Sequence, residues 1–338
     1  MKNVRNRDYA ISFIRAIALI MIIICHFMQY YNNELAWWFN TGVQIFLCIS
    51  GFLYSEKEIK NGYVFIRKGF VKLLTDYYIY IFISIVVYAV FAPQLLSLIG
   101  IVKLAFCSGV IAGLGHLWFV GTILFCYLLT PLFYEIIHRL LKENKAISIL
   151  KTTIMMLIMY VALELFVSHF NAVYVMCYFV GYIIGMEKNM LGEKWTKVIG
   201  IIIIPAAIAF NLFQIYADYI VQYNMGNGIK ALVYERFCSV SHVLLGISLF
   251  IILYIFYNKL NIENTVVEKI LDLTDEYSYD VYLAHHVWIN IGALSILNLN
   301  IHIVFRLLII LCLIGLEVYV IRLLARKFSN ALLKRNNT

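Results

Sequence analysis

The sequence has few charged residues and very few prolines, and both scarcities restrict the class of protein. Asp, Glu, Lys and Arg make up 14% of the 338 residues, against about 25% in an ordinary soluble domain. Three prolines, and no Ser/Gly-rich or single-sign charge tract, leave no sign of a linker between domains. Detachable soluble domains are therefore excluded, and we expect a single domain over residues 1–338.

Motifs for several common chemistries are also missing. No P-loop, GxGxxG or GxSxG occurs in the chain. The seven cysteines form no CxxC pair and no Cys/His ligand spacing, so we interpret them as small apolar side chains rather than as disulfides or zinc ligands. No HxxxH or HxxE pair shares a helix face. The sequence therefore predicts no metal site.

Long apolar runs dominate what is present. Hydrophobic residues make up 63% of the chain, and about ten runs are long enough to cross ~30 Å of hydrocarbon as helices. We expect an all-α polytopic membrane protein, with a re-entrant or interfacial segment at 93–115 because that stretch is dotted with glycine. The predicted spans are 10–31, 36–56, 70–92, 116–138, 148–169, 171–187, 197–217, 236–257, 278–298 and 301–325.

The net charge of +8 is better explained by membrane topology than by nucleic-acid binding, because the basic residues lie in short loops at helix ends rather than on one amphipathic face. Of 27 lysines and arginines, 22 fall in the N-terminal segment, the C-terminal segment 320–338 and loops 55–72, 139–151, 188–197 and 258–277. The positive-inside rule then predicts that both termini are cytoplasmic. The N-terminal run resembles a signal peptide, but Arg15 interrupts it and no small-x-small site follows, so we expect it to stay attached as the first span.

Two ionisable residues lie in that first span. Arg15 and His26 are eleven positions apart, so on a helix they share one face and are separated by ~16 Å of rise. Ionisable groups within a membrane are costly and usually functional. In the alternative interpretation, Arg15 only anchors the helix end and His26 bonds a neighbouring helix.

Other polar residues at membrane depth have both functional and structural interpretations. His116 and Trp118 lie in HLWF, where an interfacial aromatic belt could explain the tryptophan. His285 and His286 point ~100° apart on a helix, which predicts that they do not both face one small site. For five isolated residues, interhelical hydrogen bonding is the favoured interpretation: Glu164, Glu317, Asn211, Gln214 and His242.

The loop between the second and third spans is basic and contains Arg67, Lys68 and Lys72. It could simply set topology and contact anionic lipid. Because the positive-inside rule places it on the same side as Arg15, it could also bind the phosphates of a cytoplasmic cofactor.

Four motifs together resemble the membrane-bound acyltransferase 3 family, whose members O-acylate extracytoplasmic glycans in bacteria. Arg15 and His26 match the family's Arg-x10-His, and FLCISGFL (46–53) is similar to its SGF segment. HLWF (116–119) with YLLTPLF (127–133) resembles its fourth-helix signature, and YLAH (282–285) resembles its Tyr-x-x-His. The chain departs from the family in lacking Arg-x-x-Arg before the third helix and the glutamate after the LWF-like motif.

The resemblance implies an O-acyltransferase that moves an acetyl or other short acyl group from cytoplasmic acetyl-CoA to a hydroxyl of a glycan or lipid-linked saccharide. Arg15, with Arg67, Lys68 and Lys72, would hold the phosphates of the cofactor, and His26 would act as general base or be transiently acylated. His116, Trp118 and His285 would contact the acceptor, and His116 and His285 could alternatively stabilise the oxyanion. The setting implied is a bacterial inner membrane, with lipid contacts and a possible homo-oligomer.

Two other functions are compatible with the same residues. A transporter or flippase for a glycan precursor would use Arg15 and His26 as a charged path without covalent chemistry. A catalytically silent partner of a polysaccharide synthase would use neither residue for chemistry.

Overall fold

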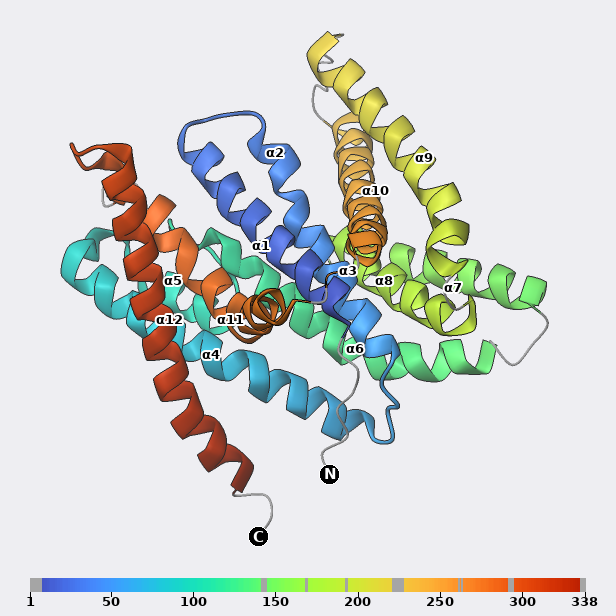
Figure 1. The fold of residues 1–338 in the computed structure, drawn as a ribbon, viewed down its shortest axis with the longest axis horizontal. Helices are drawn as coiled ribbons and strands as arrows, with labels where there is room; N and C mark the ends of the chain where they lie inside the picture. The colour runs from blue at the N-terminus through green and yellow to red at the C-terminus, as the bar shows by residue number, and fades with distance from the viewer. Residues whose placement is uncertain are drawn as a thin grey trace. The chain divides into compact units, whose positions relative to one another are not determined.

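A computed structural model describes residues 8–140, 145–167, 170–191, 194–220, 228–260, 262, 264–290 and 295–334. Helices account for all of its regular elements, and these residues contain no strand (Figure 1). The α-helices are α1 (Tyr9–Tyr30), α2 (Ala36–Phe39), α3 (Thr41–Ser55), α4 (Gly62–Phe91), α5 (Leu98–Ala105), α6 (Trp118–Leu140), α7 (Lys145–Phe166), α8 (Ala172–Leu191), α9 (Trp195–Ile215), α10 (Ile229–Leu260), α11 (Thr265–Asn290) and α12 (Ile303–Lys334). Short 3-10 turns occur at Pro93–Leu95, Gly115–Leu117 and Ile296–Asn298, and a π-helical turn at Tyr216–Ile220.

Seven stretches of the described chain are long and apolar enough to cross a membrane. They comprise α1, α2 with α3, α4, α6 with its preceding turn, α9 with its π-helical turn, α10 and α12. The all-α polytopic membrane class is thereby confirmed. Three further predicted spans, α7, α8 and α11, are also helices. The count of ten crossings stays a prediction.

The boundaries of α11 correct one sequence expectation. Residues 258–277 are predicted as a loop, whereas α11 begins at Thr265. Its first half contains Glu268, Asp272, Asp275 and Glu276, which lower the hydropathy without interrupting the helix.

The chain divides into two compact units, each described by itself. Unit 1 contains Met1–Ile22, Trp37–Glu58 and Phe133–Asp275, and unit 2 contains Ile23–Ala36, Ile59–Leu132 and Glu276–Thr338. Four helices, α1, α2, α6 and α11, therefore contribute residues to both units. The single-domain description of residues 1–338 stays a prediction.

Unit 1 is built around the packing of α3 on α8. A Cβ on Gly51 would overlap the carbonyl oxygen of Tyr178, and one on Gly181 would overlap that of Cys48. Small residues let helix backbones approach closely in membrane proteins. The glycine of the SGF motif is thus a close-packing residue.

In unit 2, glycines of α4 allow close packing against the fourth-helix motif YLLTPLF. A Cβ on Gly69 of α4 would lie 2.8 Å from the ring of Tyr127, and one on Gly62 would lie 3.0 Å from Pro131. YLLTPLF therefore packs on α4 through these two glycines.

The segment at 93–117 contains the eight-residue helix α5, two short 3-10 turns and irregular backbone, and no long helix, as its glycines predict. Tyrosines of α4 donate hydrogen bonds to its carbonyl oxygens: Tyr77 to Leu104 (2.7 Å), Tyr78 to Ala105 (3.0 Å) and Tyr88 to Ala112 (2.6 Å). Non-helical backbone at membrane depth needs such partners from protein. These bonds fix the segment that leads into His116.

Candidate active site

Four histidines of unit 2 form one buried cluster. The centroid of the His26 ring lies 4.2 Å from that of His286, 5.1 Å from His285 and 6.4 Å from His116. The His116 ring in turn lies 4.7 Å from His286 and 5.3 Å from His285. None of the four is more than 9% exposed. Three helices, α1, α6 with its preceding turn, and α11, thus bring residues distant in sequence to one place.

The prediction that His285 and His286 do not both face one small site is wrong. Their ring centroids are 6.0 Å apart, yet each ring contacts both His26 and His116. The ~100° step separates the Cβ directions, but an imidazole extends several ångströms beyond Cβ. The rings of His26 and His116 lie between these two Cβ directions, so both His285 and His286 can contact them.

Backbone carbonyls orient three of these rings. His116 Nε2 donates to Leu283 O at 3.0 Å, His285 Nδ1 to Tyr282 O at 2.7 Å, and His286 Nδ1 to Gly113 O at 2.7 Å. The Tyr282 hydroxyl donates to His116 O at 2.5 Å. Tyr282 of the YLAH motif is thus a partner of the HLWF motif, which explains why both motifs occur in one chain.

These bonds determine which ring nitrogens can act as bases. A carbonyl oxygen only accepts, so the nitrogen bonded to it carries the hydrogen, and the other nitrogen of a neutral imidazole carries a lone pair. Those nitrogens are Nδ1 of His116 and Nε2 of His285, and both are buried without a hydrogen-bond partner in the described part of the chain. The site therefore presents acceptors toward a ligand that can donate a hydrogen.

His26 is oriented by an amide. Its Nδ1 lies 2.6 Å from Oε1 of Gln29, one helical turn further along α1. Since the amide oxygen accepts the Nδ1 hydrogen, Nε2 of the neutral ring is the basic nitrogen. Sequence reasoning missed Gln29, although its i+3 spacing from His26 was the available signal.

Trp118 follows the HLWF histidine by two positions, at the start of α6. Its described ring neighbour is Phe119, at 6.4 Å between centroids. The grouping of Trp118 with His116 and His285 as an acceptor contact stays a prediction.

Arg15 lies in unit 1 and forms an ion pair there with Asp275 of α11. Ser12 donates to the other oxygen of the same carboxylate at 2.6 Å. The side chains of Arg15 and Asp275 are 17% and 11% exposed. Arg15 is therefore held by a specific partner, and its function stays a prediction. Asp275 was missed because its segment was predicted to be a loop.

The predicted phosphate-binding residues Arg67, Lys68 and Lys72 lie in the first half of α4, in unit 2. Lys68 and Lys72 are exposed, and Arg67 is partly buried. They present positive charge on a helix rather than on the predicted loop, because α4 begins at Gly62 with Asn61 as its N-cap.

Four of the five isolated polar residues, Glu164, Glu317, Asn211 and His242, bond a neighbouring helix, as predicted. Glu164 pairs with Arg236 at 2.9 Å, Glu317 accepts from Trp288 Nε1 at 2.9 Å, and Asn211 donates to Ser241 O at 3.1 Å. The amide of Gln214 instead lies 3.4 Å from Asp218, one turn away. The ring of His242 in α10 has a backbone hydrogen bond to Trp37 of α2 and stacks on the indole of the same residue, with centroids 4.5 Å apart.

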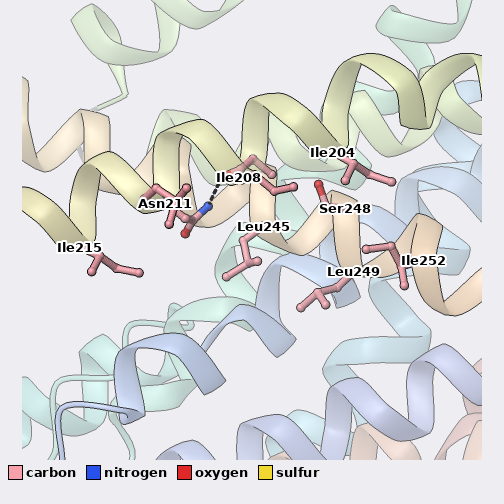
Figure 2. A pocket seen from close by; sticks show the side chains of 10 residues that line it. Ile204, Ile208, Asn211, Ile215, Leu245, Ser248, Leu249 and Ile252 are labelled. Atoms are coloured by element: carbon pink, nitrogen blue, oxygen red, sulfur yellow. Dashed lines mark hydrogen bonds between the residues drawn. The ribbon is translucent and has the colours of Figure 1, made fainter.

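A groove of about 270 Å³ lies in unit 1, between α9 and α10. Figure 2 shows aliphatic side chains, among them Ile208, Leu245 and Leu249, around it. Two polar residues also line it, and both donate to backbone: Asn211 to Ala207 O and Ser248 to Ile203 O. The groove suits hydrocarbon and carries no catalytic group.

No set of three or more His, Cys, Asp or Glu side chains placed to hold a metal ion occurs among the residues that the structure describes.

A family model described as an acyltransferase domain matches residues 8–322, nearly the whole chain. Because the match covers nearly the whole chain, the chain belongs to the acyltransferase 3 family. It is accordingly a membrane acyltransferase in the general sense. Searches of curated proteins and of solved structures find no match.

Proposed function

We propose that the protein transfers an acetyl or other short acyl group from cytoplasmic acyl-CoA to a hydroxyl of an extracytoplasmic glycan or lipid-linked saccharide. The observation that carries the proposal is the histidine cluster of unit 2. His116 Nδ1 and His285 Nε2 are buried lone-pair nitrogens without partners in the described chain. A hydroxyl supplies the hydrogen that such nitrogens lack, whereas a carbonyl, ether or oxyanion does not.

In the proposed reaction, Nε2 of His26 removes the hydroxyl proton as the oxygen attacks the thioester carbonyl carbon. The tetrahedral intermediate then collapses: the C–S bond breaks, an ester remains on the acceptor, and the proton passes from His26 to the CoA thiolate. His116 and His285 accept hydrogen bonds from the acceptor. In this account they position the nucleophile rather than stabilise an oxyanion, because an oxyanion requires donors.

Arg15 is the proposed ligand of the CoA phosphates, assisted by Arg67, Lys68 and Lys72. Arg15 engages Asp275 through one nitrogen, NH1, and a guanidinium has five N–H donors, so hydrogens remain for phosphate oxygens. The proposed setting is a bacterial inner membrane with both termini in the cytoplasm. The 22 lysines and arginines assigned to that side support this orientation.

The test uses the purified full-length chain in lipid nanodiscs with acetyl-CoA labelled in the acetyl group. Label should appear in an ester of an added glycan or of saccharide lipid extracted from bacterial membranes, with release of CoA thiol. Transport of a saccharide lipid across a vesicle membrane without ester formation would instead establish the flippase alternative. Absence of both activities would favour a silent partner of a synthase.

A further inference from the structure

When neutral, the four histidines clustered in unit 2 have no hydrogen left to donate to a ligand. A neutral imidazole carries one N–H and one lone pair. Each of the four rings has one nitrogen hydrogen-bonded to a protein oxygen that can only accept. These oxygens belong to Gln29, Leu283, Tyr282 and Gly113, which bond His26, His116, His285 and His286 respectively. The second nitrogen of every ring therefore carries a lone pair, and the cluster presents hydrogen-bond acceptors alone.

Two of these acceptor rings lie close to the proposed base. The ring centroids of His116 and His285 are 5.3 Å apart, and they lie 6.4 and 5.1 Å from that of His26. All three side chains are buried, so bulk water has little access to them. The hydrogens that their lone pairs accept therefore come from a molecule bound within the cluster.

The number of hydrogens that a ligand must bring follows from this arrangement. A hydroxyl group has one hydrogen, so it can satisfy one of these nitrogens at a time. In the proposed reaction the attacking hydroxyl gives its hydrogen to Nε2 of His26. The lone pairs of His116 and His285 then require a second hydrogen, which a hydroxyl on a neighbouring carbon of the same sugar can supply. An ester, ether or fluorine in that position would place a lone pair against a lone pair, which leaves a buried acceptor unsatisfied.

We propose that the histidine cluster acylates only a hydroxyl that has a free hydroxyl beside it on the same sugar, and so places one acyl group on each pair of neighbouring hydroxyls. This inference rests on the proposed function and adds to it the class of acceptor, a diol. The acylated pair has lost one hydrogen-bond donor, so it binds less well than the diol and is released without a second acylation.

Only one of the two hydroxyls changes its bonds. The attacking oxygen forms the ester bond to the acyl carbon while the C–S bond breaks, and its hydrogen passes through His26 to the CoA thiolate. The O–H bond of the neighbouring hydroxyl stays intact, and its hydrogen is shared with Nδ1 of His116 or Nε2 of His285. These two histidines are thus positioning residues that select the acceptor.

The first measurement locates the acyl groups on the product. The full-length protein in nanodiscs receives excess labelled acetyl-CoA with the methyl glycosides of glucose, galactose and mannose, and with saccharide lipid extracted from bacterial membranes. Mass spectrometry should find a single acetyl group on each acylated pair of neighbouring hydroxyls. Acetylation of both members of a pair, or of a hydroxyl without a free neighbour, would overturn this inference and leave the proposed function intact. Formation of no ester would overturn both.

The second measurement removes the hydrogen of the neighbouring hydroxyl and keeps the rest of the sugar. Each hydroxyl of an accepted methyl glycoside is replaced in turn by fluorine, which is similar in size but donates no hydrogen. We expect kcat/KM to fall about three- to tenfold when the fluorine lies beside the acylated hydroxyl, since an ordinary hydrogen bond contributes about that much. Equal use of the hydroxyl and fluorine compounds would overturn the inference.

Fluorine also withdraws electrons from the attacking oxygen, so variants are needed to isolate the hydrogen bond. In His116→Phe or His285→Phe the accepting nitrogen is gone, and at least one of these variants should show a smaller ratio of kcat/KM between the hydroxyl and fluorine compounds than the parent does. His138→Phe is the matched control, because His138 bonds Tyr134 O of its own helix, and it should keep the parental ratio.

The ratio compares two acceptors within one protein, so it does not depend on how much of a variant folds. A parental ratio in both His116→Phe and His285→Phe would overturn the inference, because the fluorine effect would then be electronic. The comparison of acceptors in the parent protein needs no variant.

Discussion

Gln29 Oε1 lies 2.6 Å from Nδ1 of His26 and is therefore the group that sets the orientation of this imidazole. In many hydrolytic sites a carboxylate orients the catalytic histidine. Here the partner is a neutral amide on the same helix. It fixes the tautomer without adding a negative charge to the buried cluster.

The first prediction follows from that bond. Gln29→Leu should lower turnover by roughly three- to tenfold, the equivalent of one ordinary hydrogen bond of about 0.5–1.5 kcal/mol. Gln29→Glu should retain most of the activity, since a carboxylate also accepts the Nδ1 hydrogen. Steady-state acetyl transfer by purified variants measures both. Equal loss in the two variants would show that Gln29 does not act through His26.

Arg15 and Asp275 should affect CoA binding in opposite directions. Arg15→Ala should weaken it, and Arg15→Lys should restore only part, because the planar fork is lost. Asp275→Asn should tighten it, because a competing anion next to the guanidinium is removed. Calorimetric titration with CoA measures all three. If Asp275→Asn weakens binding as much as Arg15→Ala does, the pair is structural and Arg15 is not a phosphate ligand.

The basic stretch of α4 is expected to contribute exposed charge contacts. Replacing Lys68 and Lys72 together by glutamine should weaken CoA binding and make the remaining affinity less dependent on salt, since exposed charges are screened. The matched control replaces Lys103 and Lys230, two exposed lysines predicted to lie on the opposite side. Unchanged affinity and salt dependence in the Lys68/Lys72 variant would assign the stretch to topology alone.

The orientation of the chain can be tested with single cysteines introduced at Glu34 and Lys60, both exposed, after removal of the seven native cysteines. An impermeant thiol reagent applied to intact cells should label position 34 and not position 60. The reverse labelling pattern would place the proposed CoA site on the outer side of the membrane, away from cytoplasmic CoA. That result would contradict the proposed mechanism.

The sequence was sufficient to predict the helical membrane class because apolar runs of the required length are direct signals. The family motifs were predictable as a set, although what each motif does was not. Gly51 is constrained by the backbone of Tyr178 and Gly69 by the ring of Tyr127. Neither partner can be read from a single chain, because the contacts join residues far apart in sequence.

The candidate site was predicted in part. His26, His116 and His285 were identified from the sequence and lie together. His286 was left out because the prediction considered only the direction of each Cβ and not the length of the imidazole side chain. Asp275 was missed because four carboxylates lower the hydropathy of the first half of α11. The helix tolerates them: Asp275 is paired with Arg15 and Glu276 with Arg326.

The measurement that tests the account most directly compares His26→Ala with the parent for both CoA binding and acetyl transfer. Arg15 and His26 are ~16 Å apart along α1, so they should perform separate tasks. His26→Ala should bind CoA with nearly parental affinity while turnover falls about a hundredfold or more, the usual contribution of general-base catalysis. His138→Ala is the control, because that ring bonds only to Tyr134 O of its own helix among its described hydrogen bonds and should leave turnover unchanged. A folded His26→Ala protein that transfers acetyl groups at the parental rate would contradict the assignment of His26 as the base.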